Sequence, residues 1–367
     1  MWNESKKTIN KGIDPEEQNK KSDKKGLSKK GLIFRIINIV VVVGFGAFLV
    51  YYLLSRIDIR DLKNAFVNIY KPTLIAALLL FLLGDYFRAY RSNILVGSDR
   101  VGMKDMFIVA QIRNAFNMVL PARTGELSYV YVLTRRFGFP LEIGVSTLVV
   151  ALIFDLVIVF SLIVISIVIV GINTIAVSSV SIIIIASVLF IVFLLVLFYL
   201  SKIIGLFLFI FEKILKKYKI SKERILYRIY SKLVDINENI KIIRKRRIYW
   251  KVYLTSIIIR IIKFTAYYLV IYSLMRHMGY GFKELNYWVI LLATVAAELS
   301  AVLPTHALAG FGTYEGAFVL ALTLLGFAEN IATVVGFSYH IIVLLFTVGL
   351  GIISMIILSL PFYRIKK

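Results

Sequence analysis

Long uninterrupted runs of apolar residues constrain this chain more than any other feature of its sequence. A helix needs about 20 consecutive apolar residues to cross a bilayer, and runs of that length recur from Gly31 onward. Hydrophobic residues make up 59% of the 367 residues, whereas a soluble domain has roughly 45–50%. The sequence therefore predicts an all-α polytopic membrane protein.

The apolar runs differ in length, and the difference predicts two kinds of segment. Two short runs, 106–120 and 286–304, are each followed by proline and glycine and are predicted to be broken helical elements. With them the chain has eight hydrophobic segments. The six longer runs are predicted to be full transmembrane helices, at about 31–54, 72–92, 143–170, 175–200, 252–276 and 331–360.

The distribution of positive charge predicts the orientation of these spans. The formal net charge is +23. If the N-terminus is cytoplasmic, the inner segments hold 35 Lys and Arg and the outer segments hold six. Cytoplasmic loops carry the excess of Lys and Arg, so both termini are predicted to be cytoplasmic and the location is predicted to be the plasma membrane. Because the charge has this topological cause, nucleic acid is not expected as a partner.

Three further segments follow from this topology. Residues 1–30 are predicted to be a disordered basic cytoplasmic tail, residues 31–361 the transmembrane domain, and residues 362–367 a short basic C-terminus. The basic loop 201–251 is predicted to face anionic lipid, with an amphipathic helix around 205–217.

Several classes of chemistry have no support in the sequence. There is no cysteine, and the three histidines have no metal-ligand spacing. No phosphate-loop motif or other catalytic signature is present. Neither a metal nor a cofactor is predicted, and no catalytic residue is assigned.

The first broken element contains the stretch "NMVLPARTGE", residues 117–126. It runs apolar from the cytoplasmic side and breaks at Pro121 and Gly125, with Arg123 and Glu126 beside the break. Backbone groups freed within hydrocarbon must be satisfied by protein or by water in a cavity. We interpret the element as a re-entrant helix pair, with a pair of full spans as the alternative that fits the same topology.

The second broken element, residues 296–326, has a similar design and enters from the outside in the predicted topology. Its helix carries Glu298 and is broken around Pro304; three glycines follow, with Glu315 among them before a second apolar helix. These glycines are Gly310, Gly312 and Gly316. Broken helices entering from opposite faces are typical of transporters whose site lies between inverted repeats. The ions and the helix breakers are therefore predicted to line one polar cavity.

Charged residues inside the apolar segments are the candidates for that cavity, because a charge at bilayer depth costs roughly 2.5–3.5 kcal/mol. For Asp155 the alternative is a protonated contact between helices, and for Glu298 it is packing. For Arg260, lining the cavity and snorkelling to the interface are equally favoured interpretations. Asp85, Arg88 and Arg91 are predicted to be interfacial anchors first, with a headgroup entry site as the less favoured alternative. The residues predicted to bind a headgroup are Arg113, Asn117, Arg123, Glu126, Asp155, Lys263, Glu298 and Glu315.

These two motifs resemble the flippase-like transmembrane domain of lysylphosphatidylglycerol synthases and its stand-alone relatives. The resemblance rests on "NMVLPARTGE", on Asp155 in the following span, and on "LPTHALAGFGTYEG". It covers about residues 35–360. It implies the lipid-translocating part of such proteins, and the chain is expected to lack the soluble aminoacyltransferase domain that follows it in the synthases.

The leading prediction is a flippase-like transporter that moves or exposes the headgroup of an anionic phospholipid or a polyprenyl-phosphate lipid. One alternative is a membrane transferase that adds an aminoacyl or glycosyl group to a lipid, with Glu126, Asp155 or Glu315 as general base. Another is a scaffold for a separate partner synthase. A homodimer is also left open.

Overall fold

The computed structural model describes residues 48–55, 58–170, 179–218, 225–301 and 308–360, and every regular element in these ranges is helical. All of them belong to one unit, Phe45–Lys367. The predicted tail 1–30, most of the predicted span 31–54, Pro304 and the C-terminal residues 362–367 lie outside the described residues.

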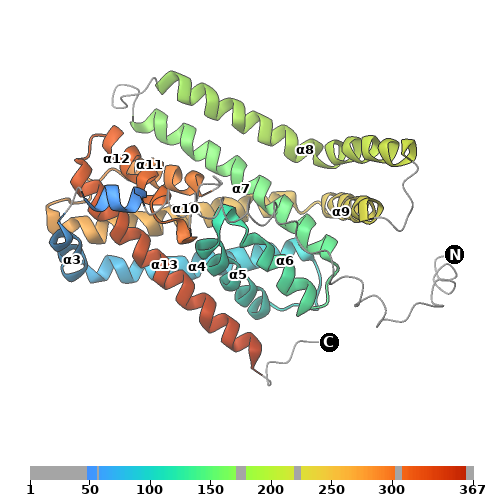
Figure 1. Ribbon diagram of the computed structural model, residues 1–367, viewed down its shortest axis with the longest axis horizontal. Coiled ribbons are helices and arrows are strands. Elements are labelled where there is room, and N and C mark those ends of the chain that lie inside the picture. The colour runs from blue at the N-terminus through green and yellow to red at the C-terminus, as the bar shows by residue number, and fades with distance from the viewer. Residues whose placement is uncertain (1–47, 56–57, 171–178, 219–224, 302–307, 361–367) are drawn as a thin grey trace, which may run out of the picture. The chain divides into compact units, whose positions relative to one another are not determined.

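Long apolar helices form the frame of the described chain (Figure 1). Among the described residues, four helices are long and apolar enough to span a membrane, and the bent helix α8 makes a fifth if it is counted as one span. These helices are α4 (Lys71–Val96), α7 (Leu141–Val170), α8 (Ser179–Lys217), α10 (Tyr249–Met275) and α13 (Glu329–Ser359). They coincide with five of the six predicted full spans. The chain is therefore a multi-pass α-helical membrane protein.

Shorter helices connect and cover this frame. The amphipathic segment predicted at 205–217 is the end of α8, which bends by 66° between Val196 and Phe198. The loop 201–251 also contains α9, which packs against α7 and α8. The shorter elements are α3 (Ile59–Val67), α5 (Met103–Val119), η1 (Pro121–Arg123), α6 (Glu126–Arg135), α9 (Ile225–Lys245), η3 (Arg276–Met278), α11 (Tyr287–Ser300), η4 (Leu308–Gly310) and α12 (Thr313–Leu324).

Helix packing places α4 at the centre of the polar site. One face of α4 packs along α10, where the Cβ position at Gly84 lies 3.3 Å from the side chain of Ile262. Its other neighbours are α5 and α7. Figure 1 shows α13 crossing α5, and these two helices are also in contact. Polar residues on the inner faces of these helices consequently point into one shared region.

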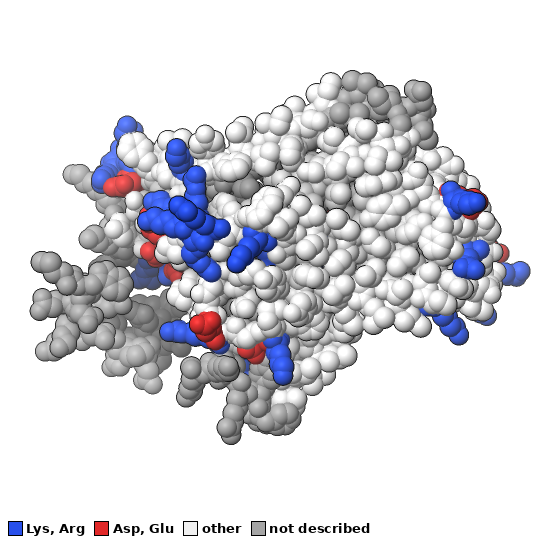
Figure 2. All heavy atoms as spheres, turned by 180° about the vertical axis from the view of Figure 1, so that it is seen from behind, with Lys and Arg blue, Asp and Glu red and all other residues white. Residues whose placement is uncertain are grey.

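Charged side chains gather at two ends of the described surface. Figure 2 shows Lys and Arg clustered toward either end of one face, with a broad region between them that carries no visible charge. Exposed apolar side chains are numerous on α8, including Ile185 and Leu195, and Val168 is exposed near the end of α7. An uncharged apolar belt between charged ends is typical of a surface in contact with lipid.

Candidate functional site

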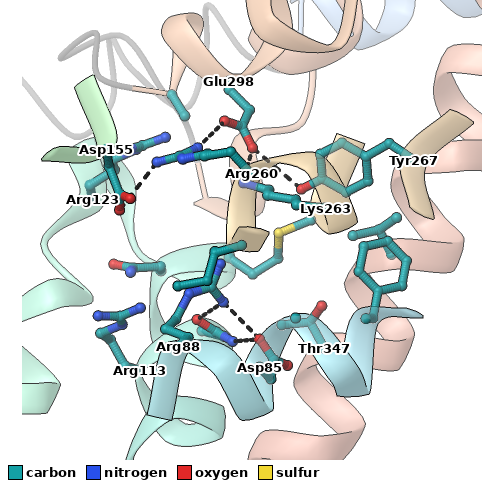
Figure 3. Close-up of a pocket in the computed structure, with 18 of the residues that line it drawn as sticks. Asp85, Arg88, Arg113, Arg123, Asp155, Arg260, Lys263, Tyr267, Glu298 and Thr347 are labelled. Carbon is teal, nitrogen blue, oxygen red and sulfur yellow. Dashed lines mark hydrogen bonds and ion pairs between the residues drawn. The ribbon is translucent and has the colours of Figure 1, made fainter. Parts of the chain in front are cut away.

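A polar cavity of about 160 Å³ lies among the long helices and the two broken elements (Figure 3). Its walls come from α4, α5, α7, α10 and α13, from the residues around η1, and from the ends of α11 and α12. The charged residues that line it are Asp85, Arg88, Arg113, Arg123, Glu126, Asp155, Arg260, Lys263 and Glu298. This concentration of charge lies between helices whose outer faces are apolar.

The first break is built by a proline and a close-packed glycine. Helix α5 ends at Val119, and Leu120 is extended, with φ −86° and ψ 140°. Pro121 then starts the 3₁₀ turn η1, where its missing N–H costs no helical hydrogen bond. At Gly125 a Cβ atom would lie 2.2 Å from the backbone N of Asn117. Only glycine allows α6 to start this close to the end of α5.

The second break uses left-handed backbone. Helix α11 ends at Ser300, and the chain re-enters the described residues at η4. Gly310 and Gly312 have φ of 75° and 87°, a region that glycine adopts without steric cost. Turn η4 contacts η1 and α5. Turns of the two broken elements are therefore in contact, and Arg123 of η1 and Glu298 of α11 both line the cavity.

Asp155 joins three helices through two arginines. Both Nη atoms of Arg91, in α4, donate hydrogen bonds to the carboxylate of Asp155, at 2.6 and 3.1 Å. Arg91 also donates a hydrogen bond to the hydroxyl of Ser256 at 2.7 Å. Arg260 of α10 approaches the second oxygen of Asp155 at 3.3 Å. Paired arginine and carboxylate groups compensate each other's cost of burial, which explains how Asp155 is tolerated within α7.

Glu298 at the end of α11 is held by the next turns of α10. Arg260 lies 3.2 Å from one of its oxygens, and Lys263 forms an ion pair with the other. The hydroxyl of Tyr267 donates to the same carboxylate at 3.5 Å. Arg260 thus connects Glu298 to Asp155, so α7, α10 and α11 share one ionic network on one side of the cavity.

A second group of charged residues faces this network from α4 and α5, as Figure 3 shows. Arg88 bonds Asp85 at 2.7 Å and the amide oxygen of Asn114 at 2.9 Å. The amide nitrogen of Asn114 donates to Asp85 at 2.7 Å. This closed triangle leaves Arg88 oriented at the cavity wall with 15% of its side chain exposed.

Glu126, in the first turn of α6, is held by α5. The amide of Asn117 donates to its carboxylate at 2.8 Å, and Arg113 lies 3.6 Å from its other oxygen. The guanidinium of Arg113 also lies 5.9 Å from the ring centre of Tyr129. The carboxylate at the break therefore ties the two helices of the first broken element together.

Arg123 differs from the other cations of the cavity. No carboxylate in the described part of the chain lies within ion-pairing distance of it. Its backbone has φ 54°, which is uncommon and unfavourable for a residue with a long side chain. Strained backbone of this kind clusters at functional sites. Arg123 is thus a cation at the point where the chain breaks that has no ion-pair partner in the described part of the chain.

The structure brings together the predicted binding residues with one exception. All of them line the cavity except Glu315, which is fully buried elsewhere. The carboxylate of Glu315 accepts the N–H of Gly312 at 2.8 Å and lies 2.5 Å from Nδ1 of His340. Its contacts are therefore those of a helix cap and a link between α12 and α13.

Sequence reasoning placed the charged end of α4 wrongly. Asp85, Arg88 and Arg91 were predicted to be interfacial anchors, but Arg91 is 1% exposed and Asp85 8% exposed. Their spacing of three residues puts them on one helix face, and this shared face was the signal that indicated a buried role. Arg260 also lines the cavity and does not snorkel.

The model of one known family matches most of the chain. The family described as "Lysylphosphatidylglycerol synthase TM region" matches residues 35–351. This range contains both broken elements and every charged residue of the cavity. No curated protein matches the chain.

Proposed function

The chain belongs to the lysylphosphatidylglycerol synthase TM region family, and from this premise we propose that it is a flippase-like transporter of a lipid with an anionic headgroup. Membership of the family indicates a multi-pass membrane protein of lipid metabolism or transport. The proposal specifies which part of the lipid the protein takes up: the headgroup enters the cavity, while the acyl chains stay in the bilayer.

The observation that carries the proposal is how the charged side chains of the cavity are paired. Its four carboxylates, Asp85, Glu126, Asp155 and Glu298, each already face a cation. Arg123 has no such partner among the described residues. Arginine binds phosphate through two parallel hydrogen bonds, so the binding capacity that remains suits a phosphate group.

The meeting of the two breaks suggests how the headgroup would pass. Turns η1 and η4, one from each broken element, are in contact. Separation of this contact on one side at a time would expose the cavity to alternate faces, as in transporters with broken helices. Since the breaks supply turns where backbone dihedrals can change, they are natural hinges.

The basic helix α9 and the end of α8 would lie at the cytoplasmic surface of the plasma membrane, with both termini on that side. These helices carry exposed apolar residues, such as Phe207, Phe209 and Ile225, and exposed basic residues, such as Lys213 and Arg228. Surfaces of this composition bind anionic leaflets. The predicted bias of Lys and Arg supports the same orientation.

The test is reconstitution of the full chain in liposomes that contain a trace of fluorescent anionic lipid. The readout is the rate at which headgroups on the inner leaflet become accessible to a membrane-impermeant quencher. Arg123→Gln should lower the rate, because a hydrogen bond to a charged group contributes about 1.5–3 kcal/mol, or roughly tenfold to a hundredfold.

Arg135→Gln is the matched control, since Arg135 is exposed at the end of α6 in the same broken element. It should move lipid at the wild-type rate. Equal rates for wild type, Arg123→Gln and protein-free liposomes would refute the proposal. A transferase, in contrast, would reveal itself by a modified lipid that disappears when the gene is deleted, with no change in the sidedness of other lipids.

A further inference from the structure

We propose that the cavity is matched to a phosphate dianion, carried as the phosphomonoester headgroup of a lipid. This inference rests on the proposed function and narrows it. Phosphodiester lipids such as phosphatidylglycerol carry one negative charge, whereas a phosphomonoester carries about −1.5 to −2 at pH 7. The number and pairing of the charges distinguish these headgroups.

Counted by formal charge, the side chains of the site have an excess of two positive charges. Five cations and four carboxylates line the cavity. Arg91, directly behind Asp155, is a sixth cation in the same network. Six cations against four carboxylates leave a net charge of +2. A dianion would neutralise this excess, whereas a monoanion would leave one buried charge without compensation, which is unfavourable.

The arginines around η1 and α10 indicate where such an anion would bind. The Nε atom of Arg260 is buried and has no hydrogen-bond partner among the described residues, whereas Nε of Arg113 faces Glu126 at 3.6 Å. Both side chains line the cavity and are 8% exposed. Arg123 adds a guanidinium with no ion pair among the described residues. Arg123 and Arg260, from η1 and α10, both line the cavity, and guanidinium groups suit the several acceptor oxygens of a terminal phosphate.

The size of the cavity fits a compact group. A volume of about 160 Å³ is smaller than the roughly 300–1,000 Å³ of pockets that enclose drug-sized ligands. A terminal phosphate needs little room beyond its oxygens. A glycerol or an aminoacyl group attached beyond the phosphate would need more room than the phosphate alone.

A cationic headgroup is disfavoured for the same reasons. It would raise the buried positive charge, and no carboxylate of the cavity is free of a cation. The site is therefore expected to reject an aminoacylated phosphatidylglycerol, although the family is described by a synthase of that lipid.

The experiment measures binding directly, by calorimetric titration of the purified full chain in nonionic detergent. The ligands are short-chain phosphatidic acid, short-chain phosphatidylglycerol and inorganic phosphate. At pH 8 phosphatidic acid should bind about tenfold or more tightly than phosphatidylglycerol, because of its second charge. At pH 5 the preference should shrink below about threefold, since the second pKa of a phosphomonoester is about 6.

Phosphatidylglycerol serves as the control for titration of the protein itself, because its charge is constant over this range. Arg123→Gln lowers the net charge to +1 and should reduce the preference for phosphatidic acid, whereas Arg135→Gln should leave it unchanged. Equal affinities for the two lipids at pH 8, or a preference that survives Arg123→Gln in full, would overturn the proposal. If inorganic phosphate binds as tightly as phosphatidic acid, the proposal that the bound phosphate belongs to a lipid is refuted.

The outcomes separate this inference from the proposed function. Transport of lipid with no preference for the monoester would refute the charge match and leave the flippase proposal standing. Selective binding of phosphatidic acid without transport in liposomes would refute the flippase proposal and leave the charge match standing.

Discussion

Substitution of Gly125 by alanine tests whether the first broken element is held as tightly as its geometry indicates. An added Cβ would lie 2.2 Å from the backbone N of Asn117 and 2.3 Å from the backbone C of Phe116. Both atoms belong to the backbone of α5, so no side-chain rotation can relieve the overlap. The end of α5 and the start of α6 would have to separate.

The size of this effect follows from the cost of overpacking, which is typically about 1–3 kcal/mol and occasionally more. Because the overlap is with backbone, we expect the upper part of that range. For a protein larger than 150 residues, each kcal/mol lowers the melting temperature by roughly 2–4 °C. Gly125→Ala should therefore lower it by at least about 5 °C, measured on the full chain in detergent by intrinsic fluorescence.

Gly316→Ala is the matched control in the second broken element. Gly316 lies within α12, and its Cβ position has no atom within 4 Å. Glycine within a helix is roughly 0.5–1 kcal/mol less favourable than alanine, so this variant should melt at the same temperature or slightly higher. Equal shifts for the two variants would refute the close packing of α5 against α6.

Two further substitutions test the ion pairs. Asp155→Asn removes the charged partner of Arg91, which is 1% exposed, and breaking a buried ion pair costs about 3–5 kcal/mol. The Asp155→Asn variant should therefore melt well below the control Asp235→Asn, a change at an exposed position of α9. Equal melting temperatures for the two variants would count against the network. Lys232 donates to Glu142, and this hydrogen bond raises the pKa of Lys232. A raised lysine pKa means that the pair stabilises the fold below the ordinary lysine pKa and is lost as the pH rises through the raised value. Although 59% of the Lys232 side chain is exposed, only 6% of the Glu142 side chain is, so Lys232→Ala leaves a buried carboxylate unpaired and should cost about 1–3 kcal/mol at pH 7. An unchanged melting temperature in the same assay would contradict this.

The apolar runs by themselves determined that the chain is an α-helical membrane protein, and they located α4, α7, α10 and α13. Proline and glycine beside charges were enough to predict both broken elements. These features are local: the length of an apolar run decides whether it can span a bilayer, and Pro121 ends a helix whatever surrounds it.

Only the tertiary structure decided which charges meet. Arg91 and Glu315 show the difference. Arg91 looked like an interfacial anchor, but α4 packs on α10 with that face inward, so Arg91 reaches Asp155. Glu315 looked like a cavity residue, but it caps α12 and contacts His340. A sequence reveals which residues share a helix face, but the partner of that face depends on how the helices pack, and pairing of buried charges depends on that partner.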